Sequence, residues 1–112
     1  MNFDLETFFS KEEFILQTAH QISKDLAGLT ANAPNWNVDL DAPALKQMST
    51  QLRPVLKDLE GDFLQQFIYK VDLKEQDFIR GLDARDDFEL LSILIIKREA
   101  QKVYLRQQFS SH

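Results

Sequence analysis

The sequence contains no cysteine, and this absence excludes several kinds of chemistry at once. Disulfide bonds, thiolate zinc sites, iron–sulfur clusters and cysteine nucleophiles all require that side chain. Glycine is also scarce: Gly28, Gly61 and Gly81 lie too far apart to form a glycine-rich phosphate loop or a dinucleotide-binding fingerprint. The 112 residues must therefore bury a core without cross-links, and the 44% of apolar residues is sufficient for that.

The side chains that build metal and hydrolytic centres are few as well. Histidine occurs only as His20 and His112, and Gln17 stands where a Glu-x-x-His metal motif would place its acid. No serine lies in a Gly-x-Ser-x-Gly nucleophile elbow. The sequence therefore predicts no catalytic residue, no metal ligand and no bound cofactor.

Long apolar runs are missing too. The longest unbroken run spans residues 93–96, whereas a membrane-spanning helix needs about 20 predominantly apolar residues. The first nine residues include Asp4 and Glu6 but no Lys or Arg, which does not fit a signal peptide. The net charge of −5 disfavours bulk attraction to nucleic acid or anionic lipid. We expect a cytoplasmic, soluble protein with no membrane partner.

The spacing of apolar residues predicts helices, the first over residues 11–28. Ser10 and Glu13 have the spacing of a capping box, and Phe9 and Phe14 that of a hydrophobic staple. One apolar stripe follows at spacings of four and three residues, formed by Ile15, Ala19, Ile22, Leu26 and Leu29. This spacing is typical of an amphipathic helix with a single buried face.

Residues 30–41 are predicted to be a long loop. Pro34 and several asparagines interrupt helical continuity, while Trp36, Val38 and Leu40 alternate with polar residues as in a strand. The sequence offers no second strand to pair with this one, and an isolated strand is unstable. We therefore expect an extended segment whose apolar side lies across the helices.

A second long helix is predicted over residues 42–70, with Asp41 as its N-cap. Pro54 removes one helical hydrogen bond, so we expect a kink or a break there and a helix in two pieces. Gly61 is a second weak point of this helix.

A short helix over residues 73–80 is predicted next, with a capping box at Asp72 and Glu75 and an end at Gly81. The last helix is predicted over residues 85–108, with Asp83 or Asp86 as its N-terminal cap. Apolar residues surround the first half of this last helix on all sides, which predicts a buried, central element. It also excludes the polar recognition helix of a DNA-binding helix-turn-helix, so we expect no DNA partner.

Together these segments predict one all-α domain over residues 1–112. The expected architecture is an up-and-down helical bundle of three long helices and one short helix. The segments IYKVDLKE (residues 68–75) and IIKRE (95–99), the latter followed by QKV (101–103), resemble stretches of a family of small bacterial all-α proteins with no assigned activity. The resemblance implies a bacterial origin and a small all-α fold, and it brings no activity or site residues.

Charge is segregated near the C-terminus. Residues 72–89 carry a net charge of −4, and residues 90–112 a net charge of +3. Arg98, Lys102 and Arg106 share one side of the last helix, so they could bind an acidic partner or could instead complement helix termini within the fold.

We therefore hypothesise a non-enzymatic module for protein–protein contact, whose partner is another protein or a second copy of itself. Its candidate interaction surface consists of Trp36, Arg98, Lys102, Arg106 and Phe109. A first alternative is an enzyme or small-ligand binder with a pocket between the helices over 42–70 and 85–108, lined by Tyr69, Lys70, Arg98 and Tyr104. A more distant alternative is RNA binding through the basic end of the last helix.

Overall fold

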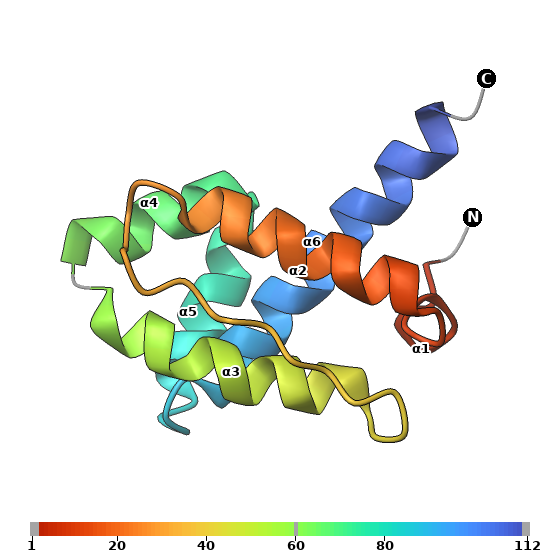
Figure 1. Ribbon diagram of the computed structural model, residues 1–112. Coiled ribbons are helices and arrows are strands. Elements are labelled where there is room, and N and C mark those ends of the chain that lie inside the picture. Colours follow the sequence, from red (N-terminus) through yellow and green to blue (C-terminus); the bar gives the residue numbers. More distant parts are fainter. Residues whose placement is uncertain (1–2, 60, 111–112) are drawn as a thin grey trace.

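The computed structural model describes residues 3–59 and 61–110 and confirms the all-α class. Within these ranges there is no strand, and the chain forms six helices (Figure 1): α1 Leu5–Phe8, α2 Glu12–Leu26, α3 Ala44–Asp58, α4 Gly61–Val71, α5 Glu75–Asp83 and α6 Glu89–Ser110. The predicted bundle of three long helices and one short one is not confirmed: residues 42–70 form two helices, as the expected division into two pieces implied, but α1 was not expected. His112 lies outside the described residues.

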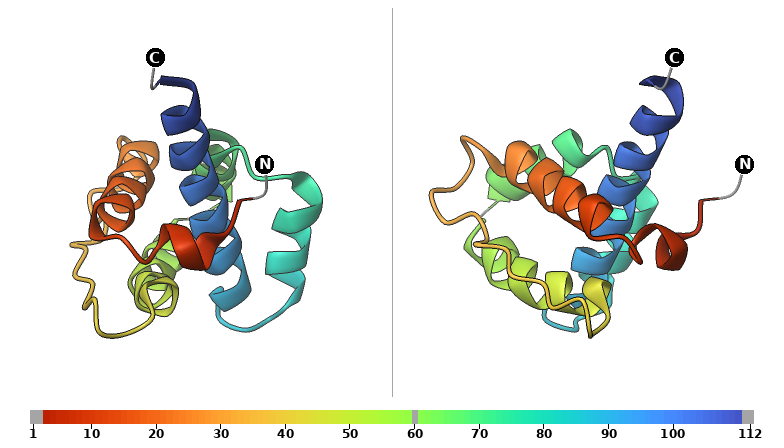
Figure 2. Two further views of the ribbon diagram at one scale, coloured as in Figure 1. Left: turned by 90° about the vertical axis from the view of Figure 1, so that its right-hand side faces the viewer. Right: turned by 45° about the vertical axis from the view of Figure 1, so that its right-hand side comes forward.

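The helix α6 is the central element, as its apolar sequence predicts. It packs against each of the other five helices in the described part of the chain. Leu91, Ile95 and Ile96 in its first half are completely buried. Its last turns leave the bundle and project from it (Figures 1 and 2), where Phe109 is 75% exposed. No helix within the described ranges has both the length and the apolar character that crossing a membrane requires.

The helix predicted over residues 42–70 is interrupted after Asp58 and not at Pro54. The helix α3 continues through Pro54 to Asp58, and the chain becomes extended at Leu59. The proline is exposed, so water can reach the carbonyl that loses its helical partner. Leu52 and Leu56 on either side of it are completely buried and hold the helix together. The helix α4 then starts at Gly61, whose φ of +45° is a left-handed conformation.

The N-terminal caps also differ from the prediction because of α1. The Ser10 hydroxyl donates to the Thr7 carbonyl of α1 and does not cap α2. Asp4 caps α1 by accepting the backbone N–H of Glu6 at 3.2 Å, and it also accepts the hydroxyl of Thr7 at 2.7 Å. The ring that stacks on Phe14 is that of Phe8, with centroids 4.4 Å apart, instead of the predicted Phe9.

Further along the chain, one of three predicted acidic caps is correct. The carboxylate of Asp86 accepts the backbone N–H of Leu90 at 3.0 Å and so caps α6. Asp72 does not cap α5, because a φ of +64° places it in the turn that ends α4. Asp41 does not cap α3 either, since Pro43 precedes that helix. Gly81 lies inside α5 and does not end it.

The long loop, residues 27–43, packs its apolar side on the helices as expected. Trp36 and Val38 are half-buried against the core, whereas Leu40 is exposed. The indole N–H of Trp36 donates to the Ser23 hydroxyl of α2 at 2.9 Å. The loop is therefore attached to α2 by one side chain as well as by apolar contact.

Two glutamines of α3 pair with the backbone of this loop as a neighbouring strand would. Gln51 accepts the N–H of Asn37 at 2.8 Å and donates to its carbonyl at 2.7 Å. Gln47 does the same for Asp39, at 2.7 and 2.8 Å. These side-chain amides satisfy extended backbone that has no strand partner in the described residues.

Replacing Gln51 by alanine tests this pairing. Gln51→Ala should lower the free energy of unfolding by about 1–2 kcal/mol, because two backbone groups lose their protein partners. Since Trp36 is the only tryptophan, its fluorescence should shift to the red as the loop loosens. Urea denaturation followed by this fluorescence measures both effects. Gln65→Ala on α4 is the control, and an equal loss there would contradict the assignment.

Candidate functional site

The structure places the five residues of the predicted interaction surface in different settings. Trp36 is half-buried in the loop, which runs along α2 and α3 and away from the projecting end of α6 (Figures 1 and 2). Arg106 and Phe109 are exposed on that projecting end. The structure therefore does not bring Trp36 together with the C-terminal residues of α6.

Arg98 and Lys102 are instead engaged within the fold, at the C-terminal end of α4. Arg98 donates from Nε to the carbonyl of Asp72 at 3.0 Å and from Nη2 to its carboxylate at 2.9 Å. Lys102 donates to the carbonyl of Lys70 at 3.1 Å. Positive charges at this position are stabilised by the negative C-terminal end of the helix dipole. These contacts correspond to the structural role that the sequence left open for the basic strip.

Lys102 also belongs to a buried charged cluster between α2 and α6. Its Nζ lies 3.0 Å from the carboxylate of Asp25 and 2.6 Å from Oε1 of Glu99. Glu99 is completely buried, and Gln21 donates to Asp25 from the same face of α2. Sequence analysis did not identify this cluster, because Glu99 looks like one more charge on a basic helix end.

The two carboxyl groups of the cluster have opposite pKa shifts. Burial, with a contribution from neighbouring Asp25, raises the pKa of Glu99 from 4.5 to about 8 despite the charge of Lys102. Burial alone would raise the pKa of Asp25 too, but hydrogen bonds from Glu99 and Lys102 and the charge of Lys102 hold it below its ordinary value. Because no well-aligned hydrogen bond among the described residues reaches the Glu99 oxygens, its ionised form is poorly compensated. A protonated Glu99 can donate to the Asp25 carboxylate instead.

The charged groups of this cluster do not line the main surface grooves, although Gln21, which donates to Asp25, lines one of them. The five grooves on residues 3–59 and 61–110 are lined by other residues than Asp25, Glu99 and Lys102. In an active site, a group with a perturbed pKa would be expected to face a cleft. The carboxyl pair lies where α2 packs against α6.

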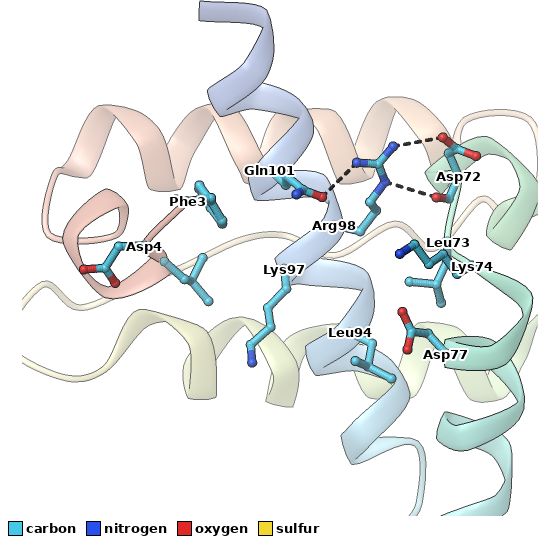
Figure 3. A pocket seen from close by; sticks show the side chains of 11 residues that line it. Phe3, Asp4, Asp72, Leu73, Lys74, Asp77, Leu94, Lys97, Arg98 and Gln101 are labelled. Carbon is cyan, nitrogen blue, oxygen red and sulfur yellow. Dashed lines mark hydrogen bonds and ion pairs between the residues drawn. The ribbon is translucent and has the colours of Figure 1, made fainter. Parts of the chain in front are cut away.

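The largest of the five grooves, about 740 Å³, lies on another face of α6. Figure 3 shows Phe3 and Asp4 on one side of it and Lys74 and Asp77 on the other. The N-terminal segment thus forms one wall, and the start of α5 forms the second. Residues of α6 make the floor between them.

The lining of this groove combines apolar surface with two unpaired cations. Leu5, Leu73 and Leu94 supply apolar surface. Lys74 and Lys97 are exposed and have no ion-pair or hydrogen-bond partner among the described residues.

Most other charged groups of the groove form ion pairs within the fold. Arg98 pairs with Asp72, and Asp77 pairs with Arg80 at 3.1 Å. Asp4 accepts the hydroxyl of Thr7, which lowers the pKa of its carboxyl. Lys74, Lys97 and the ionised Asp4 are thus the groove charges without an ion pair in the described residues, and together they leave a net charge of +1.

Sequence analysis missed most of this groove. Lys97 and Leu94 were not assigned to any surface, and the wall formed by α1 was not predicted. A usable signal was present: Leu94, Lys97, Arg98 and Gln101 have the i, i+3, i+4, i+7 spacing of one helix face. The spacing could not show that this face stays uncovered, because that depends on where α1 and α5 pack.

The four residues of the alternative pocket lie on different surfaces. Arg98 lines the large groove, whereas Tyr69 and Lys70 line a separate shallow groove on α4. Tyr104 packs against the rings of Phe3 and Phe8 at the opposite side of α6 from that helix. No group of three or more His, Asp or Glu side chains in the described residues is placed to hold a metal ion.

Comparison with known proteins gives no match: no family model, no curated protein and no solved structure is significantly similar to this chain. Functional inference therefore depends on the residues of the chain itself.

The buried carboxyl pair makes a pH-dependent stability testable. The pKa of Glu99 is higher in the folded protein than in the unfolded chain. Between pH 4.5 and about 8, the folded protein therefore keeps a proton on Glu99 that the unfolded chain has lost. This stabilisation is fully present below pH 4.5 and is lost as the pH rises through 8. From pH 5 to pH 9, we expect the free energy of unfolding to fall by about 2–4 kcal/mol.

Glu99→Gln keeps the shape of the neutral acid and cannot ionise. It should remove most of this pH dependence and should be more stable than the wild type at pH 9, as measured by urea denaturation at several pH values. Glu89→Gln, an exposed position at the start of the same helix, is the matched control. A wild type whose stability does not fall between pH 5 and 9 would contradict the assignment.

Proposed function

We propose that the protein is a non-enzymatic interaction module that binds a short, acidic, amphipathic helix of another protein in the large groove over α6. The observation that carries this proposal is the stripe formed by Leu94, Lys97, Arg98 and Gln101. These residues span two helical turns, about 10 Å of helix length. An open helix face between two walls is the geometry of helix-in-groove recognition.

The two lysines of the groove favour a partner with negative charge. Lys74 and Lys97 stand at the groove without internal partners in the described residues, while leucines from α1, the α4–α5 turn and α6 provide apolar contact. A partner helix with an apolar stripe flanked by Glu or Asp would satisfy both features. Because the whole chain carries a net charge of −5, pairing at the groove rather than long-range attraction would select this partner.

Two observations weigh against the alternatives. The carboxyl group with the strongly raised pKa, Glu99, does not line the large groove, so it cannot act as an acid or base on a ligand bound there. Arg98 pairs with Asp72 and Lys102 pairs with Asp25, which removes much of the basic strip that RNA binding would need.

A synthetic peptide tests the proposal. We would titrate the ¹⁵N-labelled protein with a helical peptide that carries leucines at i, i+3, i+4 and i+7 and glutamates beside them. We expect a dissociation constant of about 10–500 μM, as for other small, transient interfaces. Amide shifts should cluster at Leu73, Lys74, Leu94 and Lys97. The same peptide with lysines in place of glutamates should bind at least about tenfold more weakly.

Protein variants sharpen the test. Lys74→Glu combined with Lys97→Glu should weaken binding of the acidic peptide at least about tenfold, because both rim charges are reversed. Lys46→Glu changes an exposed lysine of α3 outside this groove and serves as the matched control. Equal binding of both peptides, shifts on another face, or association of the protein with itself through this groove would each contradict the proposal.

A further inference from the structure

The helix α5 is attached to the rest of the fold along one side only. It packs against α6 and has no comparably extensive contact with another helix of the described chain. Gly81 is its only buried residue, and Ile79 and Leu82 are exposed. Figure 2 shows α5 standing beside α6 at the edge of the molecule. Phe78 is its one side chain that packs against the main core of the described residues, so release of α5 would remove this ring and the contact with α6.

The contact between α5 and α6 depends on the absence of a side chain. A Cβ atom at Gly81 would lie 2.8 Å from Cβ of Leu91 and 2.9 Å from its Cα. Neither atom can move aside without moving α6 itself. The two helices can therefore approach this closely only with glycine at position 81.

An aspartate with left-handed backbone stands at each end of the segment that carries α5. Asp72, before it, has a φ of +64°, and Asp87, after it, has a φ of +61°. Residues other than glycine adopt this conformation at a cost in energy, and asparagine and aspartate tolerate it best. Local strain of this kind persists when surrounding contacts hold it.

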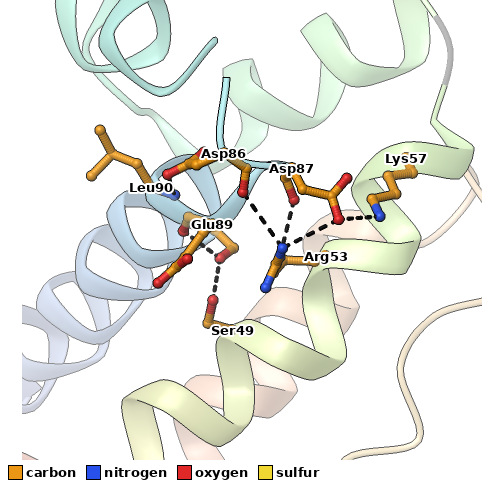
Figure 4. A network of polar contacts seen from close by, with 8 residues as sticks. Ser49, Arg53, Lys57, Asp86, Asp87, Glu89 and Leu90 are labelled. Atoms are coloured by element: carbon orange, nitrogen blue, oxygen red, sulfur yellow. Dashed lines mark hydrogen bonds and ion pairs between the residues drawn. The ribbon is translucent and has the colours of Figure 1, made fainter. Parts of the chain in front are cut away.

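Both aspartates are held in the same way by an arginine from a neighbouring helix. Arg98 of α6 donates from Nε to the carbonyl of Asp72 and from Nη2 to its carboxylate (Figure 3). Arg53 of α3 donates from Nε to the carbonyl of Asp87 at 3.0 Å and from Nη2 to its carboxylate at 3.2 Å (Figure 4). We call these two contacts the Asp72 clasp and the Asp87 clasp.

The Asp87 clasp has a second cation. Lys57 of α3 donates to the same carboxylate oxygen as Arg53. These partners lower the pKa of Asp87, the hydrogen bond from Lys57 contributing most. The clasps are accessible to solvent, so dissolved salt can weaken them.

We propose that α5 is a hinged arm that swings away from α6 about Asp72 and Asp87 while the other helices stay folded, and that the two clasps keep it closed. Opening uncovers Leu91, which is completely buried in the closed arrangement. Leu91 lies one turn before Leu94 on the same face of α6, so the apolar floor of the groove becomes longer. The inference rests on packing and the clasps, and it holds or fails independently of the proposed partner.

Hydrogen exchange of single amides, measured by NMR without any peptide, tests the hinge. In the wild type, amides of residues 75–83 should exchange at least tenfold faster than the buried amides of α3, and faster again in 0.5 M NaCl. Arg53→Gln combined with Arg98→Gln should accelerate exchange in α5 at least tenfold further and leave α2 and α3 unchanged. Arg80→Gln is the matched control, because Arg80 pairs only with Asp77 of α5 itself in the described chain.

A second variant opens the arm without altering a clasp. Gly81→Ala should push α5 from Leu91 and accelerate exchange in residues 75–83 while α2 and α3 keep their protection. Circular dichroism and the emission of Trp36 verify that both variants fold. The proposal is overturned if α5 exchanges in step with α3 in the wild type, or if the arginine variant exchanges its α5 amides as slowly as the wild type does.

Discussion

The fold depends on burying one helix. The first half of α6 is apolar on nearly every side, so no single neighbour can cover it, and five helices surround it. The helices α2, α3 and α4 are amphipathic and each bury one apolar stripe, whereas α5 buries only Gly81. Other helices leave part of α6 accessible. Between α1 and α5 it forms the floor of the groove, and its last turns project from the bundle.

The same central helix carries the least expected group of the protein. Glu99 is completely buried one turn from the apolar contacts of Ile95 and Ile96. The fold accommodates it by pairing a neutral acid with the Asp25 carboxylate and by placing Lys102 against both. A buried polar cluster of this kind fixes how two helices align, because sliding α2 along α6 would separate the groups.

Local sequence patterns predicted the helices well and their ends less well. The apolar spacing identified the central helix, and Asp86 caps it as expected. Pro54 did not end α3, because buried leucines on both sides outweigh one lost hydrogen bond. The groove and the Asp72 clasp could not be predicted, because they join residues distant in sequence.

The glutamine pairs of α3 have a consequence for the length of the long loop. Gln47 and Gln51 are one helical turn apart, a rise of about 6 Å, and Asn37 and Asp39 are two extended residues apart, which is nearly the same distance. The spacing of the two glutamines along α3 thus matches the spacing of their two backbone partners along the loop. Inserting one residue between Asn37 and Asp39 would break the match for one glutamine and turn the apolar side of the segment to solvent, whereas most substitutions at these two positions leave the backbone pairing available.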